Sequence, residues 1–160
     1  MRETEVQIGN PCLDVLCLTV RYCRKCKELN LPVRYFSTAL RYAQDHWRHQ
    51  RCGSSSKDKT AQYRSENAKG KRWHDGLVYE HAIPFKYMLN AMLALPDVTP
   101  NSVRAVLEKF DVMVLITREE DARLNASGLK QKMPADWDDV DSLARYKAVG
   151  IALIPNKIGP

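Results

Sequence analysis

Apolar residues recur at helical spacing through the first third of the chain. Between Asn10-Pro11 and Leu29, this pattern predicts an amphipathic or largely buried helix with apolar residues at helical spacing, namely Leu13, Leu16, Cys17, Val20, Cys23 and Leu29. A second helix is predicted from about Val33 to Cys52, with Phe36, Leu40, Ala43 and Trp47 on one face. Because only Asn30-Leu31-Pro32 separates the two, residues 1–52 are expected to form an antiparallel helical hairpin.

The middle of the chain alternates between short strand patterns and helix patterns. Leu77 to Ile83 is a strand candidate that Pro84 ends. A helix follows, with one face made of Phe85, Met88, Leu89, Met92 and Leu93. Thr99-Pro100 is an N-cap and first-turn pair that opens a helix to about Phe110. The continuous apolar run Val112 to Ile116 predicts a buried strand, and Thr117 and Glu120 then match the capping box of a helix that ends near Ser127-Gly128.

The remaining pattern completes an α+β, helix-rich single domain with a small ββα-like element of short strands. A helix is expected from about Val140 to Val149 and a last strand at Ile151 to Ile154, which makes at most three strands. The chain of 160 residues has the usual size of one domain. We divide it into the hairpin (1–52), an irregular mobile loop (53–72), a candidate ββα core with a helical insertion (73–128) and a C-terminal helix and tail (129–160).

The composition of the chain indicates in which cellular compartment the protein is expected. No apolar run approaches the roughly 18 residues that span a bilayer, and the N-terminus has no apolar stretch after its first charges. Five cysteines are an odd number without the density of a disulfide scaffold, which is typical of a reducing compartment. We therefore expect a cytoplasmic protein without a membrane partner.

The positive charge of the chain is concentrated in one segment. Residues 48–72 contain eight basic and two acidic side chains, and this excess equals the formal net charge of the whole chain, +6. Tyr63 and Trp73 lie in or beside the segment. Such a surface attracts phosphates through the release of counterions, so we expect nucleic acid, DNA in particular, to contact Arg64, Lys69, Lys71 and Arg72. A solvated flexible loop would have the same composition.

The stretch Tyr79-Glu80-His81-Ala82-Ile83-Pro84 resembles the opening strand of the HNH nucleases, the ββα-metal superfamily. The run Val112 to Ile116, followed by Thr117-Arg-Glu-Glu-Asp121, resembles the second strand and the helix of that motif. The resemblance implies a metal-dependent endonuclease or nickase in which His81 is the general base. It also implies that Glu80 and Asp121 are ligands of a divalent metal, Mg²⁺ with Mn²⁺ as a substitute.

The residue types suit phosphodiester hydrolysis without the resemblance. His is a base near neutral pH, and a hard cation held by carboxylates stabilises charge on the phosphate. In an ideal strand, however, Glu80 and His81 point to opposite faces, so a shared site needs a distorted strand end near Pro84. The same residues also have non-catalytic explanations. His81 can be a core or surface histidine and Glu120 a capping residue, and the helix dipole favours an acidic residue such as Asp121 in the first turn.

Cys23-x-x-Cys26, with His46, His49 and Cys52, suggests a structural zinc site. The helical hairpin argues against zinc, because it brings Cys26 beside Phe36 and leaves Cys12 as the thiol near His49. We therefore expect free, partly buried thiols.

Two other functions fit the sequence besides a nuclease. One is a non-catalytic nucleic-acid-binding protein that uses the basic segment 48–73. The other is a protein-interaction module or inhibitor that docks through Trp137 and its neighbours Asp136, Asp138, Asp139 and Asp141. The chain contains no glycine-rich nucleotide-binding motif and no nucleophile elbow, which argues against nucleotide hydrolysis and serine hydrolase chemistry.

Overall fold

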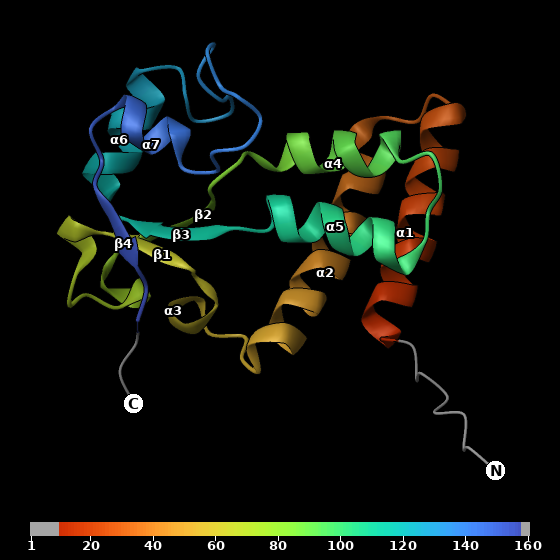
Figure 1. The fold of residues 1–160 in the computed structure, drawn as a ribbon, viewed down its shortest axis with the longest axis horizontal. Coiled ribbons are helices and arrows are strands. Elements are labelled where there is room, and N and C mark those ends of the chain that lie inside the picture. Colours follow the sequence, from red (N-terminus) through yellow and green to blue (C-terminus); the bar gives the residue numbers. More distant parts are fainter. Residues whose placement is uncertain (1–9, 158–160) are drawn as a thin grey trace.

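The computed structural model describes residues 10–157, which fold into a helical half and a sheet half (Figure 1). The helical half contains α1 (Pro11–Glu28), α2 (Val33–Cys52), α4 (Phe85–Ala94) and α5 (Pro100–Phe110). The sheet half contains β1 (Tyr63–Ser65), β2 (Val78–His81), β3 (Met113–Ile116), β4 (Leu153–Pro155), α6 (Arg118–Ala126) and α7 (Ala144–Ala148). Three short turns lie between α2 and β2, namely α3 (Lys57–Thr60), η1 (Glu66–Ala68) and η2 (Trp73–Asp75). The expected helix-rich α+β fold is confirmed.

The predicted helical hairpin is confirmed at both of its helices. Asn10 caps α1, where its Oδ1 accepts a hydrogen bond from the backbone N–H of Cys12 at 3.0 Å. Gly53 ends α2 in the left-handed conformation, with φ of 62°. The inner side of the hairpin packs against α4 and α5 around a core that includes Leu16, Val20, Phe36, Leu40, Met88, Met92, Val103 and Leu107. In that part of the chain which the structure describes, no helix is long and apolar enough to cross a membrane.

The predicted caps of α5 and α6 are also present. The Thr99 hydroxyl accepts from the backbone N–H of Ser102 at 3.2 Å at the start of α5. At the start of α6, the Thr117 hydroxyl accepts from the N–H of Glu120 at 3.3 Å, and Glu120 Oε2 accepts from the N–H of Thr117 at 2.9 Å. Local chemistry therefore sets these two helix starts.

The sheet has four strands in the order β2-β3-β1-β4, which corrects the expected maximum of three. β2 and β3 pair antiparallel, with Glu80 opposite Val114. β1 pairs parallel with β3 and antiparallel with β4. The unpredicted strand, β1, lies inside 53–72, so this segment is not the irregular loop that its polar sequence indicated. Three residues of strand are too few to show a periodicity, and pairing on both sides holds them in place.

The C-terminal helix is shorter than predicted. It was expected over 140–149, whereas α7 covers only Ala144–Ala148. Asp138 Oδ1 accepts from the N–H groups of Val140 and Asp141, each at 2.9 Å, and Asp139 has φ of 61°. This side-chain hydrogen bonding stabilises a turn in place of the first helical turn. The predicted last strand is present as β4.

Candidate functional site

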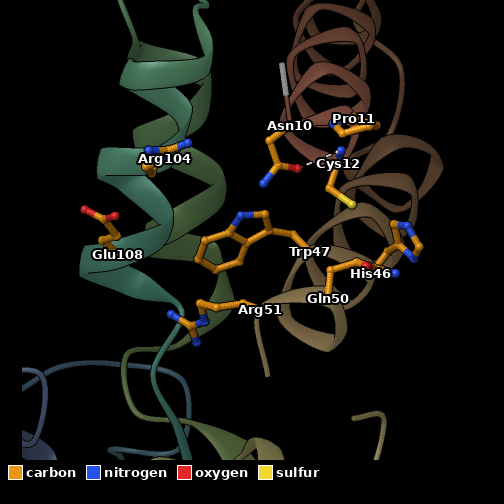
Figure 2. A pocket seen from close by; sticks show the side chains of 9 residues that line it. All are labelled: Asn10, Pro11, Cys12, His46, Trp47, Gln50, Arg51, Arg104 and Glu108. Atoms are coloured by element: carbon orange, nitrogen blue, oxygen red, sulfur yellow. Dashed lines mark hydrogen bonds between the residues drawn. The ribbon is translucent and has the colours of Figure 1, made fainter. Parts of the chain in front are cut away.

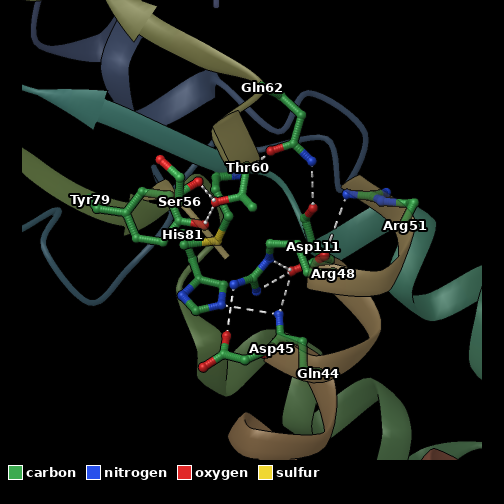
Figure 3. A network of polar contacts seen from close by, with 11 residues as sticks. Gln44, Asp45, Arg48, Arg51, Ser56, Thr60, Gln62, Tyr79, His81 and Asp111 are labelled. Carbon is green, nitrogen blue, oxygen red and sulfur yellow. Dashed lines mark hydrogen bonds and ion pairs between the residues drawn. The ribbon is translucent and has the colours of Figure 1, made fainter. Parts of the chain in front are cut away.

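His81, at the end of β2, lies in a polar network between the sheet and α2 (Figure 3). Its Nε2 is 3.1 Å from Nε2 of Gln44 on α2, and the same Gln44 amide donates to Asp111 Oδ1 at 2.7 Å. An amide NH₂ has two hydrogens, so it can donate to both groups when His81 Nε2 is unprotonated. The geometry therefore favours the neutral imidazole with its hydrogen on Nδ1.

Asp111, between α5 and β3, is the centre of this network and is only 1% exposed. Arg48 of α2 donates to Asp111 Oδ1 through Nε at 2.9 Å and also through Nη2. Arg51 Nη2 lies 3.6 Å from Asp111 Oδ2. Arg48 is itself 2% exposed, so its charge is compensated inside the fold and does not contribute to the basic surface that the sequence indicated.

The surroundings of His81 make it a weak base. Burial, together with the positive charges of three nearby arginines, lowers the pKa of His81 from 6.5 to about 3. A general base works best with a pKa near the operating pH, and its accepting nitrogen must reach the proton it removes. Here the unprotonated nitrogen already faces the Gln44 amide.

Glu80 lies on the opposite side of β2 from His81. Its Oε1 accepts from the Tyr146 hydroxyl at 2.6 Å and is 3.0 Å from Arg145 Nη2, both on α7. Burial raises the pKa of Glu80, the Arg145 charge and the Tyr146 hydrogen bond lower it, and Asp121 on α6 raises it. The structure thus brings Glu80 and Asp121 to one region, whereas His81 points toward α2. Regular pairing of β2 with β3 as far as His81 explains the separation, because successive residues of a strand alternate.

The two carboxylates predicted to hold a divalent metal each lie beside a cationic side chain. Lys130 Nζ lies 3.2 Å from Asp121 Oδ2, and the Glu80 carboxylate is paired with the buried guanidinium of Arg145. Asp121 Oδ1 is buried without a hydrogen-bond partner. Among residues 10–157, no three His, Cys, Asp or Glu side chains are grouped to hold a metal.

A basic pocket lies at the far edge of the sheet, beside β4. Its volume is about 370 Å³, and it is lined by Arg64, Lys69, Gly70, Lys71, Arg72, Ile154, Pro155 and Lys157. Five of these eight residues are cationic, and none is acidic. The predicted residues Arg64, Lys69, Lys71 and Arg72 are therefore gathered around one hollow, and Lys157 joins them from the C-terminal segment. Lys157 was not predicted from the sequence, because only the pairing of β4 with β1 brings it there.

Arg64 differs from the other cations of the basic pocket because it is only 9% exposed. Its Nη1 donates to the backbone oxygens of Ala68 and Lys71 at 3.1 and 2.9 Å, and its Nε donates to Asn156. It therefore holds the loop between η1 and η2 in place. Lys69, Lys71, Arg72 and Lys157 are exposed, so they remain available to an anion.

A second pocket, of about 840 Å³, opens between α1, α2 and α5 (Figure 2). His46, one of the residues considered for zinc, lines it together with Cys12, Trp47 and Arg104. The five cysteines are free thiols, and Cys12, Cys17, Cys23 and Cys26 are buried. Burial, with a smaller effect of Cys26, raises the pKa of Cys23 to about 11, so this thiol stays protonated.

The acidic stretch around Trp137 is tied into its own turn. Trp137 Nε1 donates to the backbone oxygen of Asp141 at 2.8 Å, and the indole packs edge-on against the Tyr87 ring with centroids 5.5 Å apart. Because the indole is used inside the fold, this stretch presents less apolar surface to a partner than the sequence indicated.

Comparisons with known proteins supply no relative on which to base a function. No family model matches the chain, and neither a curated protein nor a solved structure matches it. The function is therefore inferred from the arrangement of the chain's own side chains.

Proposed function

We propose that this protein binds the phosphate backbone of nucleic acid through the basic pocket. The observation that supports this most directly is the gathering of five cationic side chains, with no acidic one, around a single hollow. Phosphate contacts provide sequence-independent affinity by releasing condensed counterions. This clustering supports phosphate binding more specifically than the net charge does, because the cations come from two separated segments of the chain.

The charges of the basic pocket are also ordered in a way that suits a polyanion. Arg64 fixes the backbone of the Lys69–Arg72 loop from beneath, so the loop loses little additional conformational entropy when a phosphate binds. Asp58 lies 3.8 Å from Arg64 Nη2, and this acidic neighbour balances the buried guanidinium. The exposed lysines and Arg72 therefore provide the positive charge that faces the solvent.

The test is the salt dependence of binding to a fluorescent oligonucleotide. Replacing Lys69, Lys71 and Arg72 with Ala should weaken binding and flatten the plot of log Kd against log salt, by about one unit for each phosphate that the variant no longer neutralises. The matched control replaces the exposed Lys27, Arg34 and Lys86 of the helical half, which removes the same charge. Equal slopes for the two triple variants would exclude the basic pocket from the interface.

A metal-dependent nuclease is the second candidate, and one observation favours it. β2 and β3 pair antiparallel and α6 follows β3, in the element order of the ββα motif, and Glu80 lies near Asp121. Catalysis would require His81 to turn from Gln44 and both carboxylates to release their cationic partners. Incubation of plasmid DNA with Mg²⁺ or Mn²⁺ tests this, with His81→Ala and Glu80→Gln as variants. Nicking by the parent but by neither variant supports a nuclease. A plasmid that stays intact with every metal excludes the nuclease and leaves nucleic-acid binding as the function.

A further inference from the structure

Trp73 is an exposed aromatic residue next in the chain to the basic pocket. It is 40% exposed and directly follows Arg72, which lines the pocket, while its own side chain lies outside the lining. Asp58 Oδ1 accepts from the backbone N–H of Trp73 at 2.9 Å, and the same oxygen lies 3.8 Å from Nη2 of Arg64. One carboxylate oxygen thus separates the backbone of Trp73 from the guanidinium at the base of the pocket.

The position of Trp73 is set by several interactions. The short turn η2 begins where Asp75 Oδ2 accepts from the N–H of Arg72 at 2.7 Å, and it ends at Gly76 with φ of 91°. The ammonium of Lys57 lies 3.7 Å from the centroid of the indole. One face of the ring is therefore covered by a cation, and the indole still has substantial exposed surface.

Resting on the proposed function, we infer that the basic pocket takes single-stranded nucleic acid, with an unpaired base stacked on Trp73 and its phosphates at Lys69, Lys71 and Arg72. An aromatic platform beside a cationic groove is the arrangement that binds single strands, because every base has a π face. Bases inside a duplex are stacked on one another and do not offer that face to a side chain. The Lys57 ammonium and the base would occupy opposite faces of the indole.

Other exposed aromatic residues do not have this setting. Tyr22, Tyr35 and Tyr42 are more exposed than Trp73, at 50%, 58% and 72%, but they lie on the helices of the hairpin. Tyr42 is therefore a suitable control for the removal of an exposed aromatic side chain that is not beside the basic pocket.

The experiment compares binding of a fluorescein-labelled single strand of about 12 nucleotides with binding of its duplex, by anisotropy. The parent should bind the single strand more tightly. Trp73→Ala should lose about 10-fold in affinity for the single strand and little for the duplex, and Trp73→Phe should keep most of it. Tyr42→Ala should match the parent, and thermal unfolding checks that each variant is folded.

Tryptophan emission provides an independent measurement. Stacking on a base should quench the exposed indole in the parent, and this quenching should disappear in Trp73→Phe, where Trp47, 6% exposed, and Trp137 remain. Equal affinity for single strand and duplex, with no effect of Trp73→Ala, would overturn the stacking inference and leave backbone binding. Failure of the parent to bind either form would overturn the proposed function as well.

Discussion

At the residue scale, His81 shows how a local environment decides what a histidine can do. Its imidazole is partly buried, lies beside the Gln44 amide and is surrounded by arginines, so the neutral form is strongly favoured. Protonation would place a positive charge among others and remove the acceptor that faces the amide. His81 is therefore better suited to joining β2 and α2 than to proton transfer.

This environment predicts a dependence of stability on pH. The pKa of His81 is about 3 in the folded protein, whereas an unperturbed histidine has 6.5, so the unfolded state binds the additional proton between these pH values. The His81 contribution should be fully present above pH of about 6.5 and fall by at most about 1.4 kcal/mol per pH unit below it. Urea unfolding of the parent and His81→Gln at several pH values measures the difference.

The exposed His74, with a side chain 74% exposed, provides the control as His74→Gln. This variant should keep the pH dependence of the parent, whereas His81→Gln should flatten it between pH of about 6 and 4. If His81→Gln and the parent lost stability in parallel as the pH fell, the low pKa of His81 would be contradicted.

At the element scale, the start of α6 is fastened to the sheet through one side chain. Glu120 is 2% exposed, and besides the N–H of Thr117 it accepts from the Ser65 hydroxyl at 2.5 Å and from Asn67 Nδ2 at 2.9 Å. The capping residue of the helix thus also binds the end of β1 and the turn η1. A local capping signal and a long-range interaction use the same carboxylate.

Glu120→Ala should therefore destabilise the fold by more than the loss of a cap. It leaves the buried Ser65 hydroxyl and the Thr117 N–H without an acceptor, and we expect a loss of about 3 kcal/mol. Glu119→Ala, one residue earlier and exposed, should cost under about 0.5 kcal/mol. Chemical denaturation of both variants makes the comparison, and equal losses would show that Glu120 acts only within its own helix.

At the scale of the whole molecule, the polar network around Asp111 joins the helical half to the sheet half. Arg48 and Gln44 reach it from α2, His81 joins it from β2, and the Gln62 amide donates to the Asp111 backbone oxygen at 2.9 Å just before β1. Helix and sheet are therefore connected through buried polar groups as well as through apolar packing.

Asp111→Ala tests this connection. It leaves the buried Arg48 without its main partner, and such a change costs about 3 to 5 kcal/mol. Amide hydrogen exchange in β2 and α2 should rise together, because the same network supports both elements. The exposed Asp97→Ala is the control. Full retention of protection in β2 with a decrease only in α2 would contradict a connecting role.

The sequence by itself determined the elements whose signals are local. The caps at Thr99 and Thr117 and the apolar spacing of 11–52 and 85–110 predicted α1, α2, α4, α5 and α6, because a helix and its capping groups lie within a few residues of each other. The concentration of positive charge in 48–72 was equally visible, since counting needs no geometry.

Only the tertiary structure decided how these residues are used. Arg48, Arg64 and Glu120 are charged side chains that distant partners bury, and β1 exists because β3 and β4 pair with it on either side. Lys157 reaches the basic pocket through β4, and the pairing of β2 with β3 separates His81 from Glu80. These outcomes depend on contacts between residues far apart in the chain, and no local pattern specifies which partner each side chain will find.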